Sequence, residues 1–309
     1  MKILITGGAG FIGSNLSKFL LNRGHIITIV DDFSSGKYLN IEGLDLTVLE
    51  NRVEDLEVNR FEEIDCIIHL AAQASVPLSI DNFYQSSANN FLSSLKVFEI
   101  AKEFSLPVVY ASSSAVYGNL PIGDDRSDNI DILSPYALDK LTLEHYAQLF
   151  KGLFSISSIG FRFFNVYGPN QDPNSPYSGV IPLFISNSIR GDDLDVFGGE
   201  QTRDFIHVQD VCEIIEISLD KVMNLKKPQS EILNLGTGKS ISIKDLAVKI
   251  NNLVESDSLL NTLPPVKGDP ERSDGNYMKL LKSLGIKDFK FLELNEGLLE
   301  VIEWVKGNI

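Results

Sequence analysis

Residues 2–13 read KILITGGAGFIG, a short apolar strand pattern that leads directly into a loop with glycine at positions 7, 8, 10 and 13. Residues 12–23 have the spacing of a helix that ends at Gly24, and residues 26–30 have the pattern of a second strand. Glycines between a strand and a helix let the backbone turn tightly and approach a pyrophosphate at the positive end of the helix. The segment therefore predicts a dinucleotide-binding unit.

Two acidic residues, Asp31 and Asp32, follow the second predicted strand. Asp31 comes 18 residues after Gly13, close to the spacing of about 20 at which a carboxylate accepts hydrogen bonds from the adenosine ribose. An acid at this place would repel a 2′-phosphate, so the pattern favours NAD over NADP. A glycine turn without a ligand is the alternative, and the surrounding strand, helix and acidic pair argue against it.

Short apolar runs alternate with helical patterns through the first half of the chain. Further strands are predicted at 46–49, 66–70, 107–111 and 155–163, with helices around 89–103 and 134–151. Continuous β-branched runs fit strands that are buried on both faces of a parallel sheet. We expect an α/β fold: a doubly wound, Rossmann-like parallel sheet with a smaller α+β substrate lobe. The expected division is an NAD-binding domain at 1–165, to which part of about 196–222 returns, and an interleaved lobe at 166–309.

The composition narrows the class of protein. The 309 residues include 43% hydrophobic and 22% charged residues, which is typical of a globular protein with a substantial core. The net charge of −15 argues against a nucleic-acid partner, because such a partner requires a basic surface. No apolar segment is long enough to cross a bilayer, so no membrane partner is expected. Without metal-ligand spacing among the cysteines, we expect a soluble cytoplasmic protein that holds no metal.

A second candidate site combines a tyrosine, a lysine and a run of serines. Ser134 and Pro135 are suited to start a helix on which Tyr136 and Lys140, four residues apart, share one face. An ammonium beside a phenol lowers the phenol pKa from about 10 and makes it a usable acid or base. A plain amphipathic helix is the alternative for this pair alone. However, residues 112–114 are serines at the end of a predicted strand, where α/β sheets bind ligands.

Several longer motifs resemble the extended short-chain dehydrogenase/reductase family, specifically nucleotide-sugar 4-epimerases of the UDP-glucose 4-epimerase type. The resemblance runs from Met1 to about Ser273. The motifs are TGGAGFIG from Thr6, HLAAQASVP from His69, YASSSAVYG from Tyr110, SPYALDK from Ser134, FRFFNVYGPNQDP from Phe161 and QTRDFIHVQDV from Gln201.

This resemblance implies a catalytic triad and a set of ligand contacts. Tyr136 would be the base, Lys140 would hold the nicotinamide ribose and tune Tyr136, and Ser113 would bind the reacting sugar hydroxyl. Asn89 looks like the family residue that supports the active site. The implied NAD contacts are Gly7, Gly10, Phe11, Ile12, Gly13, Asp31, Asp32, Leu70, Ala71, Ala72, Asn89, Tyr136 and Lys140. The implied contacts of a UDP-sugar substrate are Ser75, Ser113, Ser114, Asn165, Val180, Phe197, Arg203, Asp269 and Ser273.

The resemblance also separates related reactions. Sugar 4,6-dehydratases carry an Asp-Glu pair, and UDP-glucuronate decarboxylases keep the Glu, where this chain has Ser114 and Ala115. We therefore expect an isomerase that performs NAD-dependent 4-epimerisation through a transient 4-keto sugar, with NAD regenerated in each cycle. A reductase acting on a keto sugar is one alternative, and net consumption of NADH would favour it. A non-catalytic NAD-binding regulatory protein is another, against which the intact triad argues.

Ser273 bears on the substrate. Relatives with a bulky Tyr at this position exclude a 2-N-acetyl group, so Ser273 suggests UDP-GlcNAc and UDP-GalNAc, together with UDP-Glc and UDP-Gal. An exposed loop position without a role in specificity is the alternative. The resemblance further implies a homodimer built from the helices that carry Asn89 and Tyr136.

Three positions depart from the family pattern. Val266, followed by Lys267, stands where relatives often have an Arg that grips the diphosphate. Arg52 replaces an Asp that in relatives often contacts the edge of the adenine ring. Either Arg52 stacks on the base, or this loop aligns with the family pattern one position away. Leu78 replaces an Arg found in many relatives, which weakens interpretations with a charged sugar such as UDP-glucuronate.

Overall fold

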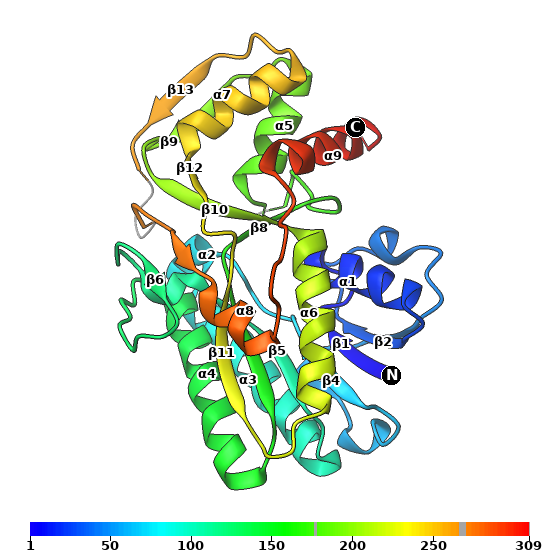
Figure 1. The fold of residues 1–309 in the computed structure, drawn as a ribbon. Helices are drawn as coiled ribbons and strands as arrows, with labels where there is room; N and C mark the ends of the chain where they lie inside the picture. Colours follow the sequence, from blue (N-terminus) through cyan, green and yellow to red (C-terminus); the bar gives the residue numbers. More distant parts are fainter. Residues whose placement is uncertain (176–177, 266–269, 309) are drawn as a thin grey trace.

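A computed structural model of the chain describes residues 1–175, 178–265 and 270–308. Within these residues the central sheet has seven parallel strands in the spatial order β11, β7, β5, β4, β1, β2, β3 (Figure 1). The strands are β1 (Lys2–Thr6), β2 (Ile26–Asp31), β3 (Thr47–Glu50), β4 (Cys66–His69), β5 (Val108–Ser113), β7 (Ser158–Phe163) and β11 (Ser230–Leu235). The chain thus starts mid-sheet, moves outward to β3, and builds the other half from β4.

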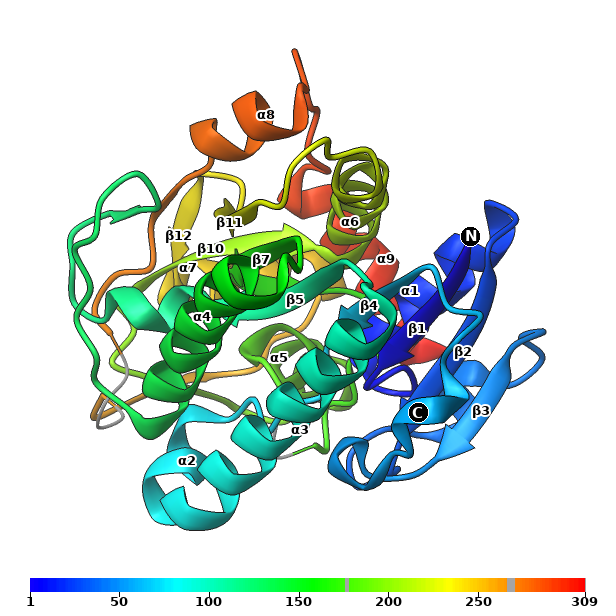
Figure 2. The same ribbon diagram turned by 90° about the horizontal axis from the view of Figure 1, so that it is seen from below.

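Helices cover both faces of this sheet (Figure 2). One face carries α1 (Phe11–Asn22), α6 (Val208–Met223) and α8 (Met278–Leu284), and the other carries α3 (Phe83–Phe104) and α4 (Pro135–Phe154), with α2 (Val76–Asp81) before α3. In β1, Ile3 and Ile5 pack toward α1 and α6, whereas Leu4 packs toward α3 and α4. Successive strand side chains point to opposite faces, so an uninterrupted apolar strand fills two cores. The predicted doubly wound sheet is confirmed.

A smaller lobe lies beyond the carboxyl ends of the central strands (Figure 1). It contains β8 (Asn165–Tyr167), β10 (Thr202–His207) and β12 (Ser240–Ser242) in one sheet, and β9 (Leu194–Phe197) with β13 (Leu260–Leu263) in another. The helices α5 (Val180–Arg190), α7 (Ile243–Val254) and α9 (Leu294–Lys306) share a separate hydrophobic core that includes Ile185, Leu246 and Val301.

The remaining elements are short. β6 (Gly123–Asp124) pairs with β14 (Gly275–Asn276), and four 3-10 helices occur in the described ranges: η1 (Tyr38–Ile41), η2 (Val53–Asp55), η3 (Val58–Arg60) and η4 (Ser114–Tyr117). Across the part of the chain that the structure describes, each helix is too short or too polar to traverse a bilayer.

The second half of the chain returns to the central sheet partly in the expected segment and partly beyond it. The elements that return to the sheet are α6, α8 and β11, and α6 falls almost entirely within the expected segment 196–222. By contrast, β9 and β10, which overlap the start of that segment, pair within the smaller lobe. β11 has the sequence SEILNL, in which polar residues interrupt the apolar ones. It is nevertheless completely buried at Leu233 and Leu235 because it adds to β7. An edge strand of mixed polarity lacks the continuous apolar run that identified the other strands.

The order of the strands places a crevice above the sheet between β1 and β4. All seven strands are parallel, but the order in which the chain adds them to the sheet reverses at this point. The connections after β1 and after β4 therefore lead to opposite faces of the sheet. Ligands of open α/β sheets bind in such a crevice, beyond the carboxyl ends of the strands. The functional candidates of both halves of the chain therefore converge on this edge.

Candidate active site

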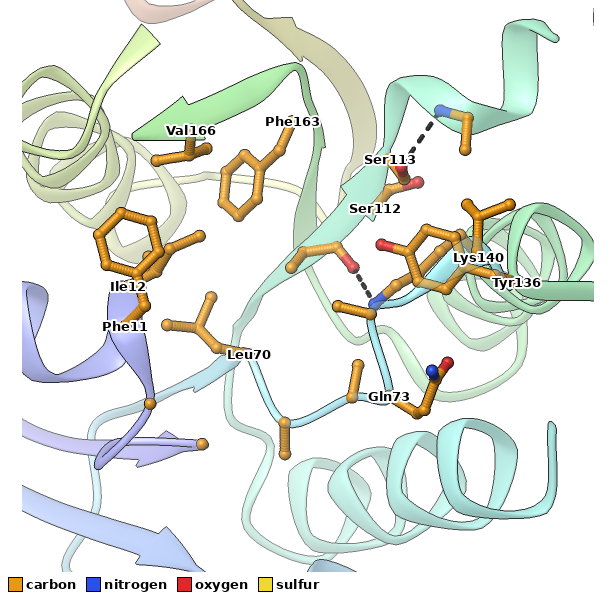
Figure 3. A pocket seen from close by; sticks show the side chains of 18 of the residues that line it. Phe11, Ile12, Leu70, Gln73, Ser112, Ser113, Tyr136, Lys140, Phe163 and Val166 are labelled. Atoms are coloured by element: carbon orange, nitrogen blue, oxygen red, sulfur yellow. Dashed lines mark hydrogen bonds between the residues drawn. The ribbon is translucent and has the colours of Figure 1, made fainter. Parts of the chain in front are cut away.

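A cavity of about 520 Å³ opens at this edge between the central sheet and the smaller lobe. The predicted cofactor residues all line it: Gly7, Gly10, Phe11, Ile12, Gly13, Asp31, Asp32, Leu70, Ala71, Ala72, Asn89, Tyr136 and Lys140. The predicted substrate residues Ser113, Ser114, Asn165, Arg203 and Ser273 line it as well. Figure 3 shows Phe11, Ile12 and Leu70 facing Tyr136 and Lys140 across this space. Residues far apart in the sequence thus share one site.

Three of the other predicted substrate residues lie outside this cavity. Ser75 does not line the cavity; its hydroxyl accepts a hydrogen bond from the Leu78 backbone N–H at 3.3 Å and caps α2. Val180 begins α5 and Phe197 ends β9 with 44% of its surface exposed, and neither lines the cavity. Asp269 lies outside the described residues, as do Val266 and Lys267.

The glycine loop leaves a cradle that side chains would fill. Gly7 has φ +72°, and a Cβ on it would lie 2.8 Å from the Ala71 nitrogen. A Cβ on Gly13 would lie 2.1 Å from the Gly7 carbonyl oxygen, which no side chain tolerates. Gly10 is the N-cap of α1 and offers no side chain to the first N–H groups of the helix. The loop therefore presents backbone donors at a positive helix end, as a pyrophosphate requires.

The acidic pair after β2 is fixed by backbone donors. The Asp31 carboxylate accepts hydrogen bonds from Ala9 N and Phe33 N, both at 2.9 Å. Burial raises the pKa of this carboxyl, and the two backbone donors counteract the rise. The Asp32 carboxylate accepts the Ser34 hydroxyl at 2.5 Å. Two acids at the ribose end of the cavity suit NAD and oppose a 2′-phosphate, so the residues present fit this cofactor.

The tyrosine and lysine lie on one face of α4, as predicted. Ser134 caps this helix by accepting Ala137 N at 3.2 Å, and Pro135 occupies the first turn. The Lys140 Nζ lies 5.7 Å from the centre of the Tyr136 ring and donates to the Ala111 carbonyl at 2.9 Å (Figure 3). The ammonium is thereby held between the end of β5 and the phenol.

The predicted direction of the Tyr136 pKa was wrong for the protein alone. Burial raises the pKa of the Tyr136 phenol, and a hydrogen bond with Ser113 lowers it only in part. Burial also lowers the pKa of Lys140 to about 8. Desolvation disfavours the charged form of each group. The sequence shows the spacing of Tyr136 and Lys140 but not the loss of water around them. This loss has the largest effect on both pKa values.

A buried polar network lies at the end of β5, next to the candidate catalytic residue Ser113. Ser113 ends β5, and the preceding Ser112 donates its hydroxyl to the Glu144 carboxylate of α4 at 2.5 Å. Glu144 forms a bidentate pair with Arg162 of β7, at 2.8 and 2.7 Å, and Arg162 also donates to the Tyr117 hydroxyl at 2.9 Å. These links connect β5, α4, β7 and η4. The backbone that carries Ser113 is therefore held by contacts from three other elements.

Two adjacent asparagines of α3 have different surroundings, and the supporting role expected of Asn89 stays a prediction. Asn89 lines the cavity but accepts hydrogen bonds from Arg52 and Gln85 near the surface. Asn90 is buried; its amide accepts from Gln73 N at 2.7 Å and donates to the Gln73 carbonyl at 3.2 Å. This pairing fixes the segment after β4, and Gln73 lines the cavity. The adjacent asparagines look alike in the sequence, and only burial distinguishes them.

The smaller lobe supplies the opposite wall. Ser273 N donates to the Thr202 carbonyl, and Asp204 N donates to the Ser273 carbonyl, each at 3.1 Å. Ser273 is therefore held beside β10, which carries the buried Arg203. Arg272 also lines the cavity and was not predicted, since a single arginine in a polar segment carries no distinctive pattern. Arg203 and Arg272 thus give the cavity two cations.

The burial of Lys140 predicts a pH-dependent stability. Its pKa is about 8 when folded and about 10.4 when unfolded, so between these values the unfolded chain binds more protons. The free energy of unfolding of the wild type should therefore rise as the pH increases from about 8 to about 10. Dinucleotide-free Lys140→Met should exceed the wild type in stability at pH 7, and the difference should shrink across this interval in urea denaturation.

Lys227→Met is the matched control, because Lys227 is exposed. It should change the free energy of unfolding little at either end of the interval. A difference between Lys140→Met and the wild type that stays constant from pH 7 to pH 10 would show that Lys140 does not lose its proton there.

Comparisons with known proteins agree with this geometry. Residues 3–236 match the model of the NAD dependent epimerase/dehydratase family. The chain is 32% identical over 314 residues to a putative UDP-glucose 4-epimerase of Methanocaldococcus jannaschii, covering 99% of both chains. It is 33% identical over 320 residues to a UDP-N-acetyl-α-D-glucosaminuronate decarboxylase of Bacillus cytotoxicus, covering 99% of this chain and 98% of that protein.

A solved structure is similar over the whole length. The UDP-N-acetylglucosamine 4-epimerase of Methanobrevibacter ruminantium, in complex with UDP-N-acetylmuramic acid, superposes with a TM-score of 0.90 at 33% identity and covers 100% of this chain and 99% of its own. The relatives thus include both epimerases and a decarboxylase. With its glycine cradle, acidic pair and Ser–Tyr–Lys group at one cavity, the chain belongs to the NAD-dependent epimerase/dehydratase family.

Proposed function

We propose that the protein is a UDP-hexose 4-epimerase that interconverts UDP-GlcNAc with UDP-GalNAc and UDP-Glc with UDP-Gal. The observation that supports this proposal is the set of residues that line the cavity beside the glycine loop. It holds Ser113, Tyr136 and Lys140, whereas position 115, also on its wall, is alanine. One proton-transfer group beside a hydride acceptor is sufficient for epimerisation. Water elimination requires a further acid and base, which alanine cannot supply.

The residues divide the work as follows. The ionised Tyr136 oxygen takes the proton of the sugar 4-hydroxyl. Ser113 hydrogen-bonds the oxygen of that sugar hydroxyl, and the positive charge of Lys140 favours the phenolate form of Tyr136. A bound NAD would supply the acceptor and donor of the C4 hydride, with no net change in its oxidation state over the cycle, and would add positive charge near the phenol. Tyr136 then gives the proton back to the new alkoxide. Atoms and electrons balance over the cycle, so no net redox change occurs.

Two positions favour epimerisation over decarboxylation. Ala115 stands where decarboxylases of the family keep a glutamate. Leu78, in α2, stands where many relatives have an arginine, so a uronate carboxylate would lose that partner. The similarity to a decarboxylase therefore reflects the shared fold and cofactor site rather than this local chemistry.

The substrate range is supported by the wall opposite the triad. Ser273 lines the cavity and its backbone is pinned to β10 beside Arg203. A serine leaves room for a 2-N-acetyl group at this place, and the cations of the smaller lobe suit a diphosphate. Neutral hexoses fit the same space.

Removal of the Tyr136 hydroxyl tests the reaction. Tyr136→Phe should lower the interconversion of all four UDP-sugars by about 10²–10⁴-fold, because the proton-transfer group is lost. Each UDP-sugar is incubated separately, its product is followed by NMR, and NADH absorbance is recorded.

Tyr146→Phe is the matched control, since Tyr146 lies on the same helix outside the cavity and packs against Phe91 and Phe150. It should retain the wild-type rate. Wild-type rates in Tyr136→Phe, or steady consumption of NADH by the wild type, would refute an epimerase that uses this phenol.

Enlarging position 273 tests the substrate range. Ser273→Tyr should reduce kcat/KM for UDP-GlcNAc and UDP-GalNAc by at least about tenfold, because the phenol would fill the space of the N-acetyl group. UDP-Glc and UDP-Gal should be affected much less, and Ser273→Ala should accept all four. An equal loss on both pairs of substrates would contradict a steric role for this position.

We also propose a homodimer formed through α3 and α4. Both helices carry large apolar side chains that are exposed in the single chain: Tyr84 (77%), Leu92 (49%), Leu138 (52%), Leu149 (50%) and Leu153 (62%). Leu149 and Leu153, four residues apart, share one face of α4. An apolar surface of this kind on adjacent helices is typical of a subunit interface.

Charges on this surface should separate the subunits. The double variant Leu149→Glu/Leu153→Glu should have the mass of one chain in light scattering, because charges would be buried in the interface. Leu299→Glu, at a 49% exposed position on α9, is the control and should keep the wild-type mass. A wild type that is monomeric at micromolar concentrations would disprove the dimer.

A further inference from the structure

The carboxyl ends of three adjacent strands place three kinds of group in a row. β1 ends at the glycine loop, β2 ends at Asp31, and β3 is followed by Arg52 (Figure 2). The register pairs Asp31 with Glu50, and Asn51 N donates to the Asp31 carbonyl at 3.1 Å. Arg52 therefore lies one strand farther from the crevice than Asp31, on the wall of the same cavity.

The Arg52 guanidinium is held by one of its nitrogens. Its Nη2 donates to the Asn89 side-chain oxygen at 2.8 Å and forms an ion pair with Glu54 at 2.5 Å. Asn89 is itself fixed by the Gln85 amide at 2.7 Å. Hydrogen-bond acceptors lie in the plane of a guanidinium, so these contacts fix its orientation without covering its flat faces. The Arg52 side chain remains 46% exposed.

We infer that Arg52 is the platform on which the adenine ring of the dinucleotide stacks. The pyrophosphate belongs at the glycine loop and the adenosine ribose at Asp31, so the base extends toward the next strand, β3. A fixed guanidinium at that point offers a planar cation to the electron-rich face of a purine. Arg52 also offsets part of the negative charge of Asp31, Asp32 and Glu54, which line this end of the cavity.

Stacking has a consequence for base recognition. An aspartate at this position, as in many relatives, can accept a hydrogen bond from the exocyclic amino group and thereby requires it. A guanidinium face contacts the ring and not its edge. Arg52 therefore makes the site tolerant of the base edge, so a dinucleotide with hypoxanthine in place of adenine should bind nearly as well as NAD.

The competing explanation is structural. Arg52 would then only tie the end of β3 to Asn89 of α3, with no contact to the cofactor. The two roles differ in what they predict for the base. A structural link would affect folding and all ligands alike. A stacking platform would affect dinucleotides and leave UDP binding unchanged, because the proposed function places UDP at the wall formed by the smaller lobe.

The experiment measures which dinucleotide the full-length protein retains. The protein is equilibrated with equal, excess concentrations of NAD and nicotinamide hypoxanthine dinucleotide, starting from either one, until the bound ratio is constant. Gel filtration removes free ligand, and chromatography of the released ligand gives both the ratio and the total retained. UDP binding and the thermal stability of the dinucleotide-free protein are measured on the same samples. None of these readouts requires epimerase activity, so failure of the proposed function would leave the test intact.

The wild type should retain the two dinucleotides within about threefold of each other. Arg52→Met and Arg52→Lys, which lose the planar group, should retain about tenfold less of both with little change in the ratio. Arg52→Asp should shift the ratio toward NAD by about tenfold, the value of one hydrogen bond. Arg60→Met, an exposed arginine in η3 outside the cavity, is the control and should match the wild type.

Two results would overturn the inference. One is a wild type that prefers NAD by more than about tenfold with retention unaffected in Arg52→Met. The other is a loss of thermal stability in both Arg52→Met and Arg52→Lys that is accompanied by a parallel loss of UDP binding, since that pattern identifies a structural tie.

Discussion

A backbone turn that only glycine permits, between β1 and α1, is the constraint on which the rest of the structure depends. A Cβ at Gly13 would collide with the Gly7 carbonyl, and one at Gly7 would press on Ala71 after β4. These close approaches hold the loop against the place where the strand order reverses. The crevice stays open because the loops after β1 and β4 leave in opposite directions. Asp31 and the helix of Tyr136 then face one space from its two sides.

Local charge in this cavity is independent of the charge of the whole chain. The protein carries a net charge of −15, yet Arg52, Lys140, Arg203 and Arg272 all line the cavity. Carboxylates line the same cavity, with Asp31 and Asp32 at the ribose end and Asp274 on the wall of the smaller lobe. An acidic protein can therefore present a local site for an anionic ligand, because screening in water confines each charge to its neighbourhood. Burial adds a second effect, since it lowers the pKa of Lys140 and raises that of Tyr136.

The reacting groups take their positions from segments that are distant in the sequence. Ser112 is fixed by Glu144, and Glu144 by Arg162, so side-chain hydrogen bonds link β5, α4 and β7. Asn90 fixes the backbone of Gln73. The Ser112–Glu144–Arg162 contacts are buried and the Asn90–Gln73 contacts are partly buried. An unpaired polar group is costly in such surroundings, so these contacts support one another. The cavity wall from the smaller lobe depends similarly on the pairing of Ser273 with β10.

The sequence by itself determined the elements whose signals are local: the glycine loop with its flanking strand and helix, the acidic pair 18 residues later, the capped helix of Tyr136 and Lys140, and the doubly wound sheet. Only the tertiary structure decided that Asn90, and not Asn89, bonds the backbone of Gln73, and that Ser75, Val180 and Phe197 do not line the cavity. It also decided that β11 completes the sheet and in which direction the Tyr136 pKa moves. The physical reason is that spacing and propensity act between neighbours along the chain. Burial, strand pairing and loss of water depend on residues that meet only after folding.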